Sequence, residues 1–165
     1  MSSFYIGGDV IIGFVLGLVY GNASEWLLHR FLLHGLGASK DSAWAFHWHD
    51  HHKTARQHQM LDEKYKIRLF SKWDPQAKEA AGLLAGAVVH LPLLWVVPGF
   101  VAGVFASALL YYFVHRQSHL DEAWAQRWVP WHWDHHMGPN QHANWCVTFP
   151  LFDYLLRTRQ PYFNT

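Results

Sequence analysis

The sequence is short of sulfur and of charge, and both shortages limit what the protein can be. Its 165 residues include one cysteine, Cys146, so the chain can form no internal disulfide and sulfur has little part in any metal site. Charged residues make up 15% of the chain, whereas soluble domains average about 25%. A formal net charge of +1 and the lack of a basic-aromatic motif argue against a nucleic-acid partner.

Charge is missing altogether from residues 80–114, a stretch of 35 residues without Asp, Glu, Lys or Arg. A membrane-spanning helix needs about 20 residues, so this stretch is too long for one helix. The pair Pro98-Gly99 near its middle is a turn signal and predicts two helices in a tight hairpin. Each half has about 17 residues, at the short end of the spanning range. Two full spans and a re-entrant hairpin are both compatible with that length.

Another apolar block runs from Val10 to Leu28 and is interrupted by Asn22, Ser24 and Glu25. We interpret it as a membrane helix whose polar end faces a functional site. No basic region precedes it, so we expect no cleaved signal peptide. The length of the whole chain predicts one domain rather than two.

The positions of the basic residues predict which side of the membrane the polar segments occupy. None of the 13 Lys and Arg residues lies in residues 1–29 or between Lys78 and Arg116. They fall in the segments that hold most of the histidines or border them, and the positive-inside rule places these segments in the cytoplasm. Two crossings between Glu79 and His115 return the chain to the same face, where early and late histidines can meet.

Fourteen histidines are the strongest functional signal in the chain. Imidazole is the commonest metal ligand in proteins. His132, His135 and His136 form the pattern H-x-x-H-H, and residues at i, i+3 and i+4 share one face of a helix. His115 and His119 are likewise one helical turn apart. The spacing therefore predicts helices whose imidazoles converge on metal.

His29 and His34 are five residues apart, which corresponds to about 140° around an ideal α-helix. Their side chains converge only if the helix ends or loosens near Gly35. Glycine is a natural residue for the end of a helix. We therefore expect an irregular helix end here.

The group around His51 and His52 leaves one ligand open. A regular H-x-x-H-H pattern would have histidine at position 48, where Trp48 stands. Both His47 and His49 are candidates for the missing ligand. His47 lies four residues before His51 and would share its helical face, so we favour His47. We expect His49 to be a spare or supporting group.

Ten histidines are therefore candidate metal ligands: His29, His34, His47, His51, His52, His115, His119, His132, His135 and His136. A structural zinc needs only four ligands, so this number implies two ions. An all-nitrogen site suits Zn, Cu, Fe or Ni. Two metals with open positions suit activation of O2, which is iron chemistry, and zinc can act as a surrogate because its affinity is higher. Seven of the ten are also assigned as catalytic: His29, His34, His51, His52, His119, His135 and His136.

Other polar residues receive weaker assignments. Glu25, Asp50 and Asp134 each lie within a turn of a proposed ligand, and carboxylates commonly orient metal-bound imidazoles. The alternative for each is a solvated charge at the membrane interface. His90 lies in the apolar stretch, where a hydrogen bond between helices is the simplest role. We expect His58 and His142 to lie at the surface or to support the ligands.

Taken together, five segments resemble the fatty acid hydroxylase / sterol desaturase superfamily of membrane non-haem di-iron enzymes. The first of them is especially similar to the fatty acid 2-hydroxylase branch. Trp48 departs from the family pattern, which has a leading histidine at that place. The five segments are EWLLHRFLLHG (25–35), HWHDHH (47–52), HRQSH (115–119), HWDHH (132–136) and NWCVTFPLFDYLLRTR (144–159).

The resemblance implies an all-α fold for residues 1–165, an integral-membrane helical bundle with a cytosolic helical cap that carries a dinuclear histidine site. It also implies O2-dependent hydroxylation of a C–H bond in a fatty acyl-type lipid that enters from the bilayer. Two Fe ions would be the cofactor. Since no cytochrome b5 domain is fused, the electron donor would be a separate cytochrome b5-like or ferredoxin-like protein. Four tryptophans would line the entry or anchor the interface: Trp44, Trp48, Trp131 and Trp133.

Alternative functions fall into two classes. A desaturase, or a sterol or carotenoid hydroxylase, would use the same metal core. A metal carrier or sensor would bind metal without catalysis, but a carrier needs a polar path across the bilayer. The apolar blocks offer little beyond Asn22, Glu25 and His90. Two tightly bound iron atoms favour an oxygenase, whereas exchangeable zinc without O2 consumption favours a carrier.

Overall fold

The computed structural model describes residues 3–163, and every regular element within that range is helical. The expected all-α class is therefore confirmed for the described chain. The elements are α1 (Ser3–Leu27), η1 (Leu28–Gly35), η2 (Leu36–Ala38), η3 (His47–His52), α2 (Lys53–Gln57), η4 (Glu63–Lys66), α3 (Pro75–Val88), η5 (Leu91–Trp95), α4 (Pro98–Ser118), α5 (Glu122–Trp128), α6 (Pro130–Met137) and α7 (Leu151–Leu155).

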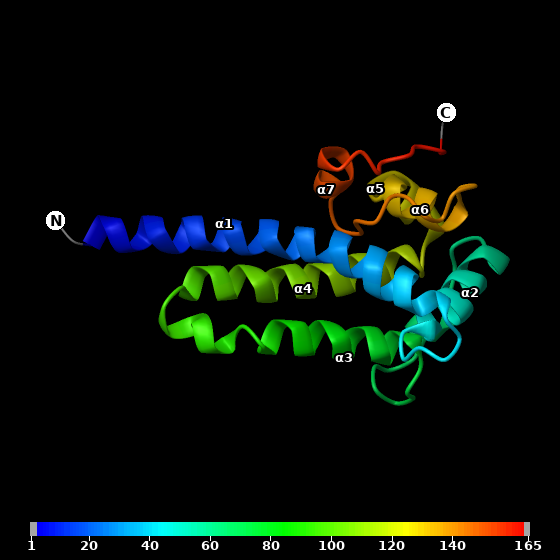
Figure 1. The fold of residues 1–165 in the computed structure, drawn as a ribbon, viewed down its shortest axis with the longest axis horizontal. Coiled ribbons are helices and arrows are strands. Elements are labelled where there is room, and N and C mark those ends of the chain that lie inside the picture. Colours follow the sequence, from blue (N-terminus) through cyan, green and yellow to red (C-terminus); the bar gives the residue numbers. More distant parts are fainter. Residues whose placement is uncertain (1–2, 164–165) are drawn as a thin grey trace.

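Three helical segments are long and apolar enough to cross a membrane: Gly8–Ala38, Pro75–Trp95 and Pro98–Ser118. Figure 1 shows them side by side, with α1 and α4 running in one direction and α3 running back. The predicted hairpin is thus present, and its turn falls immediately before Pro98. Each arm has 21 residues. A membrane-spanning helix needs about 20 residues, so both arms are long enough to cross a membrane.

Local sequence explains where α3 begins and ends. The carboxylate of Asp74 accepts a hydrogen bond from the backbone N–H of Ala77 at 2.9 Å, and Pro75 occupies the first helical position. Both features stabilise a helix start. Pro92 lacks a backbone N–H and interrupts regular α-helix, so the chain continues as the 3-10 turn η5.

Glycines bring α1 and α4 together almost backbone to backbone. A Cβ atom added to Gly17 would lie 2.9 Å from the Cα atom of Gly103 and 3.0 Å from the backbone nitrogen of Val104. Membrane helices associate through such small residues because lipid provides no hydrophobic force between them. The paired rows are Gly13, Gly17 and Gly21 on α1 and Gly99, Gly103 and Ser107 on α4.

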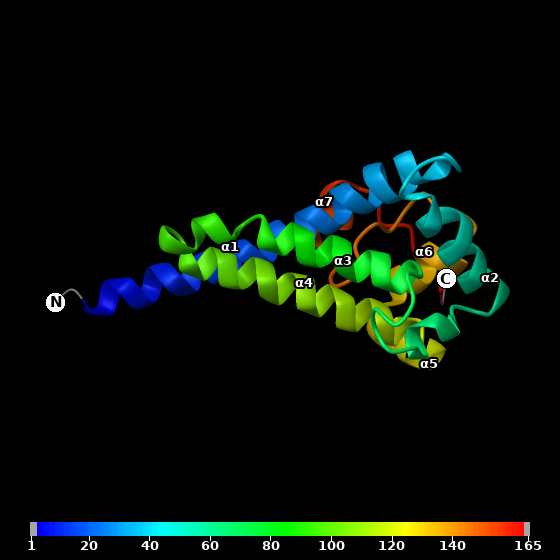
Figure 2. The same cartoon turned by 90° about the horizontal axis from the view of Figure 1, so that it is seen from below.

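Apart from η5, which lies in the turn between α3 and α4, the short helices gather at one end of the three-helix bundle (Figures 1 and 2). We call residues 36–74 and 119–163 the cap. The end of α1, the start of α3 and the end of α4 all meet the cap, and the N-terminal end of α1 lies at the opposite end of the molecule. The fold therefore brings the early and late histidines to the same end.

Replacing Gly17 with Leu is expected to destabilise the protein strongly, because the new side chain would meet the backbone of α4. Overpacking a core typically costs about 1–3 kcal/mol, and backbone yields less readily than side chains. Thermal unfolding in detergent, followed by size-exclusion chromatography, should show a midpoint lower by several degrees. The matched control is Gly8→Leu, since a Cβ at Gly8 meets nothing within 4 Å. Equal stability of the two variants would contradict the packing argument.

Candidate metal centre

Two π-helical segments, η1 and η3, position the early histidines. A π-helix forms i to i+5 hydrogen bonds, so residues five apart lie nearly above one another. His29 and His34 lie in η1, with ring centroids 5.0 Å apart. His47 and His52 lie in η3, with ring centroids 4.9 Å apart. The expected irregularity near Gly35 is thus a π-helix that occupies the whole segment.

Five buried histidines from η1, η3 and α6 form one group, called group A. Their ligand atoms all lie within 4.8 Å of one another. The Nε2 atoms of His29 and His47 are 3.0 Å apart, as are those of His34 and His52. The Nε2 atom of His135 lies 3.1 Å from that of His52 and 3.2 Å from that of His34. Group A consists of His29, His34, His47, His52 and His135.

Four more buried histidines from η3, the end of α4 and α6 form group B: His51, His115, His119 and His136. Their ligand atoms also lie within 4.8 Å of one another. His132 is fully buried beside them, with its Nε2 atom 3.4 Å from that of His119. The structure therefore brings all ten predicted ligands to one place, nine in the two groups and His132 at the edge of group B.

Consecutive histidines divide between the two groups. His51 joins group B while His52 joins group A, and His136 joins group B while His135 joins group A. Neighbouring residues on a helix point about 100° apart, so one His-His pair serves two adjacent centres. The groups meet where the rings of His52 and His136 stack, with centroids 4.2 Å apart.

His47, not His49, belongs to the histidine cluster, although the helical register differs from the expected one. The prediction grouped His47 with His51, four residues later. In the structure His47 lies with His52, because η3 is a π-helix and aligns residues five apart. His49 is partly exposed, and its Nε2 atom lies 3.0 Å from the carbonyl oxygen of Ala38.

Backbone carbonyls fix three of the imidazole rings. The Nδ1 atoms of His29, His119 and His135 each lie 2.6–2.7 Å from a carbonyl oxygen, of Trp145, Met60 and Ala143 respectively. A carbonyl only accepts hydrogen bonds, so each Nδ1 carries the proton. The Nε2 atom of each ring then directs an unprotonated lone pair into the centre. Metal-binding histidines in proteins usually have such an outer partner.

The inner nitrogens fit a cation. The Nε2 atoms of His51, His115 and His136 are buried and have no hydrogen-bond partner among the described residues. Buried polar atoms without a partner are costly. In group A, the Nε2 atoms of His34, His52 and His135 lie 3.0–3.2 Å from one another, and Nε2 of His135 carries no proton. Three such contacts cannot all be well-formed hydrogen bonds, whereas a cation between the nitrogens would accept all their lone pairs. An ion with bonds of about 2.1 Å would separate its nitrogen ligands by roughly 3.0–3.4 Å, so the observed spacing suits one ion in each group.

Burial also keeps the imidazoles in the form that binds metal. Removal from water lowers the pKa of histidines in the cap well below the usual value, and neighbouring histidines lower it further. Neutral imidazole is the ligand form. The effect is present at His47, His52, His119, His132, His135 and His136.

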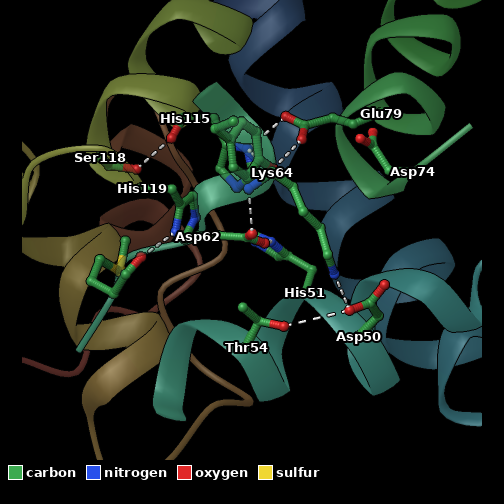
Figure 3. Close-up of polar contacts among 12 residues, drawn as sticks. Asp50, His51, Thr54, Asp62, Lys64, Asp74, Glu79, His115, Ser118 and His119 are labelled. Carbon is green, nitrogen blue, oxygen red and sulfur yellow. Dashed lines mark hydrogen bonds and ion pairs between the residues drawn. The ribbon is translucent and has the colours of Figure 1, made fainter. Parts of the chain in front are cut away.

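The carboxylates near the ligands in sequence do not orient histidines, and this expectation is wrong. Glu25 accepts hydrogen bonds from the backbone N–H groups of Val147 and Thr148, both at 3.1 Å. Asp134 pairs with Arg159 at 2.7 Å. Asp50 contacts Lys64 and Thr54 (Figure 3). These residues tie the cap to itself and to α1, which places the carbonyl of Trp145 beside His29.

Residues distant in sequence support group B instead (Figure 3). The Oε1 atom of Glu79 lies 2.6 Å from the Nδ1 atom of His115, and the hydroxyl of Tyr65 donates to Oε2 at 2.7 Å. The Oδ2 atom of Asp62 lies 3.9 Å from the Nδ1 atom of His51. Burial, and then the nearby carboxylate, raise the pKa of Tyr65 well above its usual value, so it stays a donor.

A cleft of about 340 Å³ reaches group A from the membrane-spanning part of the molecule. Its lining is mostly apolar and includes His29 and His47 at one end and Tyr20 and His90 at the other. Trp44 lines this cleft, as expected for an entry residue. The other three tryptophans pack in the cap: Trp48 stacks on His142, Trp131 donates to the carbonyl of Val147, and Trp133 stacks on Tyr162.

No protein-family model, curated protein or solved structure matches this chain. The family resemblance therefore rests on the five sequence segments alone. What the fold and the site define is an all-helical protein with three potential membrane spans and two adjacent histidine groups that can hold metal ions. Its function has to be argued from that geometry.

His47→Ala is expected to lower the bound metal, because it removes one nitrogen from group A, whereas His49→Ala should leave metal content unchanged. Loss of one ligand weakens a metal site, so at least half of the metal should be lost. Metal per protein is measured by mass spectrometry after dialysis. Loss of metal from His49→Ala alone would reverse the assignment.

Proposed function

We propose that the protein is a membrane-bound non-haem di-iron oxygenase that hydroxylates a C–H bond of a fatty acyl-type lipid. One observation carries the proposal: two adjacent buried histidine groups stand at the end of an apolar cleft between membrane-spanning helices. An oxidising centre needs a route for a lipid, and the cleft provides it. The resemblance of the five sequence segments to the fatty acid hydroxylase / sterol desaturase superfamily supports the same function.

Iron, when bound to groups A and B, would supply activation of O2. The protein's own residues would do three things. Histidine nitrogens hold two ions close together, while the carbonyls of Met60, Ala143 and Trp145 keep three rings in a fixed tautomer. Glu79 and Tyr65 hold the ring of His115. Burial of all ten imidazoles excludes water from the centre.

The proposed orientation puts the cap in the cytoplasm. All 13 Lys and Arg residues lie in the cap or within the ends of the spans that meet it. A lipid would enter from the bilayer, in which its chain already resides. The reducing electrons would come from a separate protein, cytochrome b5-like or ferredoxin-like, that reaches the cap from the cytoplasm.

Transport of metal is less compatible with the cleft than oxygenation is. A carrier needs a continuous polar path across the bilayer, and the cleft lining is mainly apolar. A desaturase, or a sterol or carotenoid hydroxylase, would use the same two histidine groups. The mass of the product separates these reactions, since hydroxylation adds one oxygen atom and desaturation removes two hydrogen atoms.

Cells that express the protein are expected to contain a lipid heavier by one oxygen atom, and isotopically labelled O2 should label it. His135→Ala should abolish this product, because His135 contributes to group A from α6, while membrane insertion is retained. The matched control is His58→Ala, which changes an exposed histidine outside both groups. Mass spectrometry of extracted lipids gives the result. Full product formation by His135→Ala would refute the proposal for this site.

A further inference from the structure

The glycines of the spanning helices are of two kinds. Gly13, Gly17, Gly99 and Gly103 of α1 and α4 are packed against backbone, whereas a Cβ added to Gly82 or Gly86 of α3 meets nothing within 4 Å. Both of these glycines line the cleft and lie one helical turn apart. Glycine in a helix costs about 1 kcal/mol relative to alanine, and no close packing explains it at these positions. What the two glycines provide is space in the cleft.

The cleft is long enough for an extended lipid chain. On α3 its lining extends from Lys78 to His90, about 18 Å at the helical rise of 1.5 Å per residue. The lining is mostly apolar along this length. An apolar passage of this length suits the hydrocarbon chain of a lipid.

A polar pair lies at the end of the cleft away from the histidine groups. The Nε2 atom of His90 lies 3.1 Å from the hydroxyl of Tyr20, and its Nδ1 atom lies 2.7 Å from the carbonyl oxygen of Gly86. The carbonyl only accepts, so Nδ1 carries the proton and Nε2 accepts from the Tyr20 hydroxyl. This bond joins α1 to the end of α3, as expected for an intramembrane histidine. A chain that follows the lining from Lys78 would reach this pair last.

A cation stands at the other end. The Nζ atom of Lys78 lies 5.2 Å from the ring centroid of Phe46, and both residues line the cleft. No carboxylate of residues 3–163 pairs with Lys78, because its neighbour Glu79 is engaged by Tyr65 and His115. The cleft thus combines an apolar passage with one uncompensated positive charge at the end near the histidine groups.

We propose that this cleft binds a single-chain fatty carboxylate, with its head group paired to Lys78 and its chain beside Gly82 and Gly86. The Tyr20–His90 pair sets the longest chain that fits. The proposed function is the reason for regarding this lipid as a substrate. Binding itself requires no turnover, so the two proposals are tested separately.

Chain length is tested by binding of brominated fatty acids from decanoate to stearate, followed by quenching of tryptophan fluorescence in the purified full-length protein. Trp44 lines the cleft and reports on its occupation. Gly86→Leu should weaken binding of the stearate probe about tenfold or more, since each methylene withdrawn from the cleft contributes roughly fourfold. Binding of the decanoate probe should be retained. Gly82 lies closer to Lys78 in the sequence of α3, so Gly82→Leu should weaken binding of the shorter probes as well.

Gly8→Leu is the control for the glycine variants, because Gly8 also has open space but does not line the cleft. Its binding profile should equal that of the unchanged protein. Equal weakening of all chain lengths by Gly86→Leu, or no weakening at all, would overturn the assignment of the chain path. Binding of a second copy of the protein across the cleft would also overturn it, and size-exclusion chromatography detects that outcome.

The head-group contact is tested with a fatty acid and the fatty alcohol of the same chain length. The unchanged protein should prefer the carboxylate, Lys78→Arg should keep this preference, and Lys78→Met should lose it while binding the alcohol as before. If Lys78 merely reached the membrane interface, its replacement would not change the ratio of the affinities for the fatty acid and the fatty alcohol. A preference that survives Lys78→Met refutes the contact. Binding without any oxygenated product would refute the proposed function and leave this site standing.

Discussion

Convergence of imidazole nitrogens in a buried space is the constraint on which the rest of the structure depends. Imidazole nitrogens held about 3 Å apart cannot all satisfy one another with hydrogen bonds, and burial disfavours adding protons to them. A metal cation would satisfy them together, and the surrounding elements keep the nitrogens in position for one. The outer nitrogens of His29, His119 and His135 are fixed by carbonyls, so the rings cannot turn away. The cap is organised around this requirement.

The three long apolar helices serve the same requirement from a distance. Close contact of α1 with α4 at Gly17 and Gly103 fixes the two helices against each other, so that their C-terminal ends lie side by side at the cap. The first carries on into η1 with His29 and His34, and the second ends at His115 and Ser118. α3 stands farther from α1 and leaves the cleft between them. Tight packing on one side of the bundle and open space on the other are therefore both needed.

Periodicity predicted much of this arrangement, because a helix repeats every 3.6 residues whatever surrounds it. The three histidines of α6 lie on one face as expected, and the irregular helix at His34 followed from its distance to His29. The π-helical register of η3 was not predictable from spacing alone. It depends on contact with η1, and it moved His47 from the expected partner His51 to His52.

Supporting contacts were the least predictable part of the centre. Asp50 and Asp134 lie near ligands in sequence, but a residue just before a His-His pair points away from the centre when the pair points inward. Glu79 of α3 supports His115 of α4, and no local sequence pattern predicts a contact between two separate helices. The small residues of α1 and α4 did carry a readable signal, a glycine at every fourth position, which indicates close helix contact.

The division of each His-His pair between two groups couples the occupancy of the two sites. An ion held by His52 and His135 would restrain the backbone that also carries His51 and His136. The entropy lost in ordering those residues would then already have been spent when the second ion arrived. Binding of the two ions would accordingly be coupled, and the affinity of each group would depend on whether the other is filled.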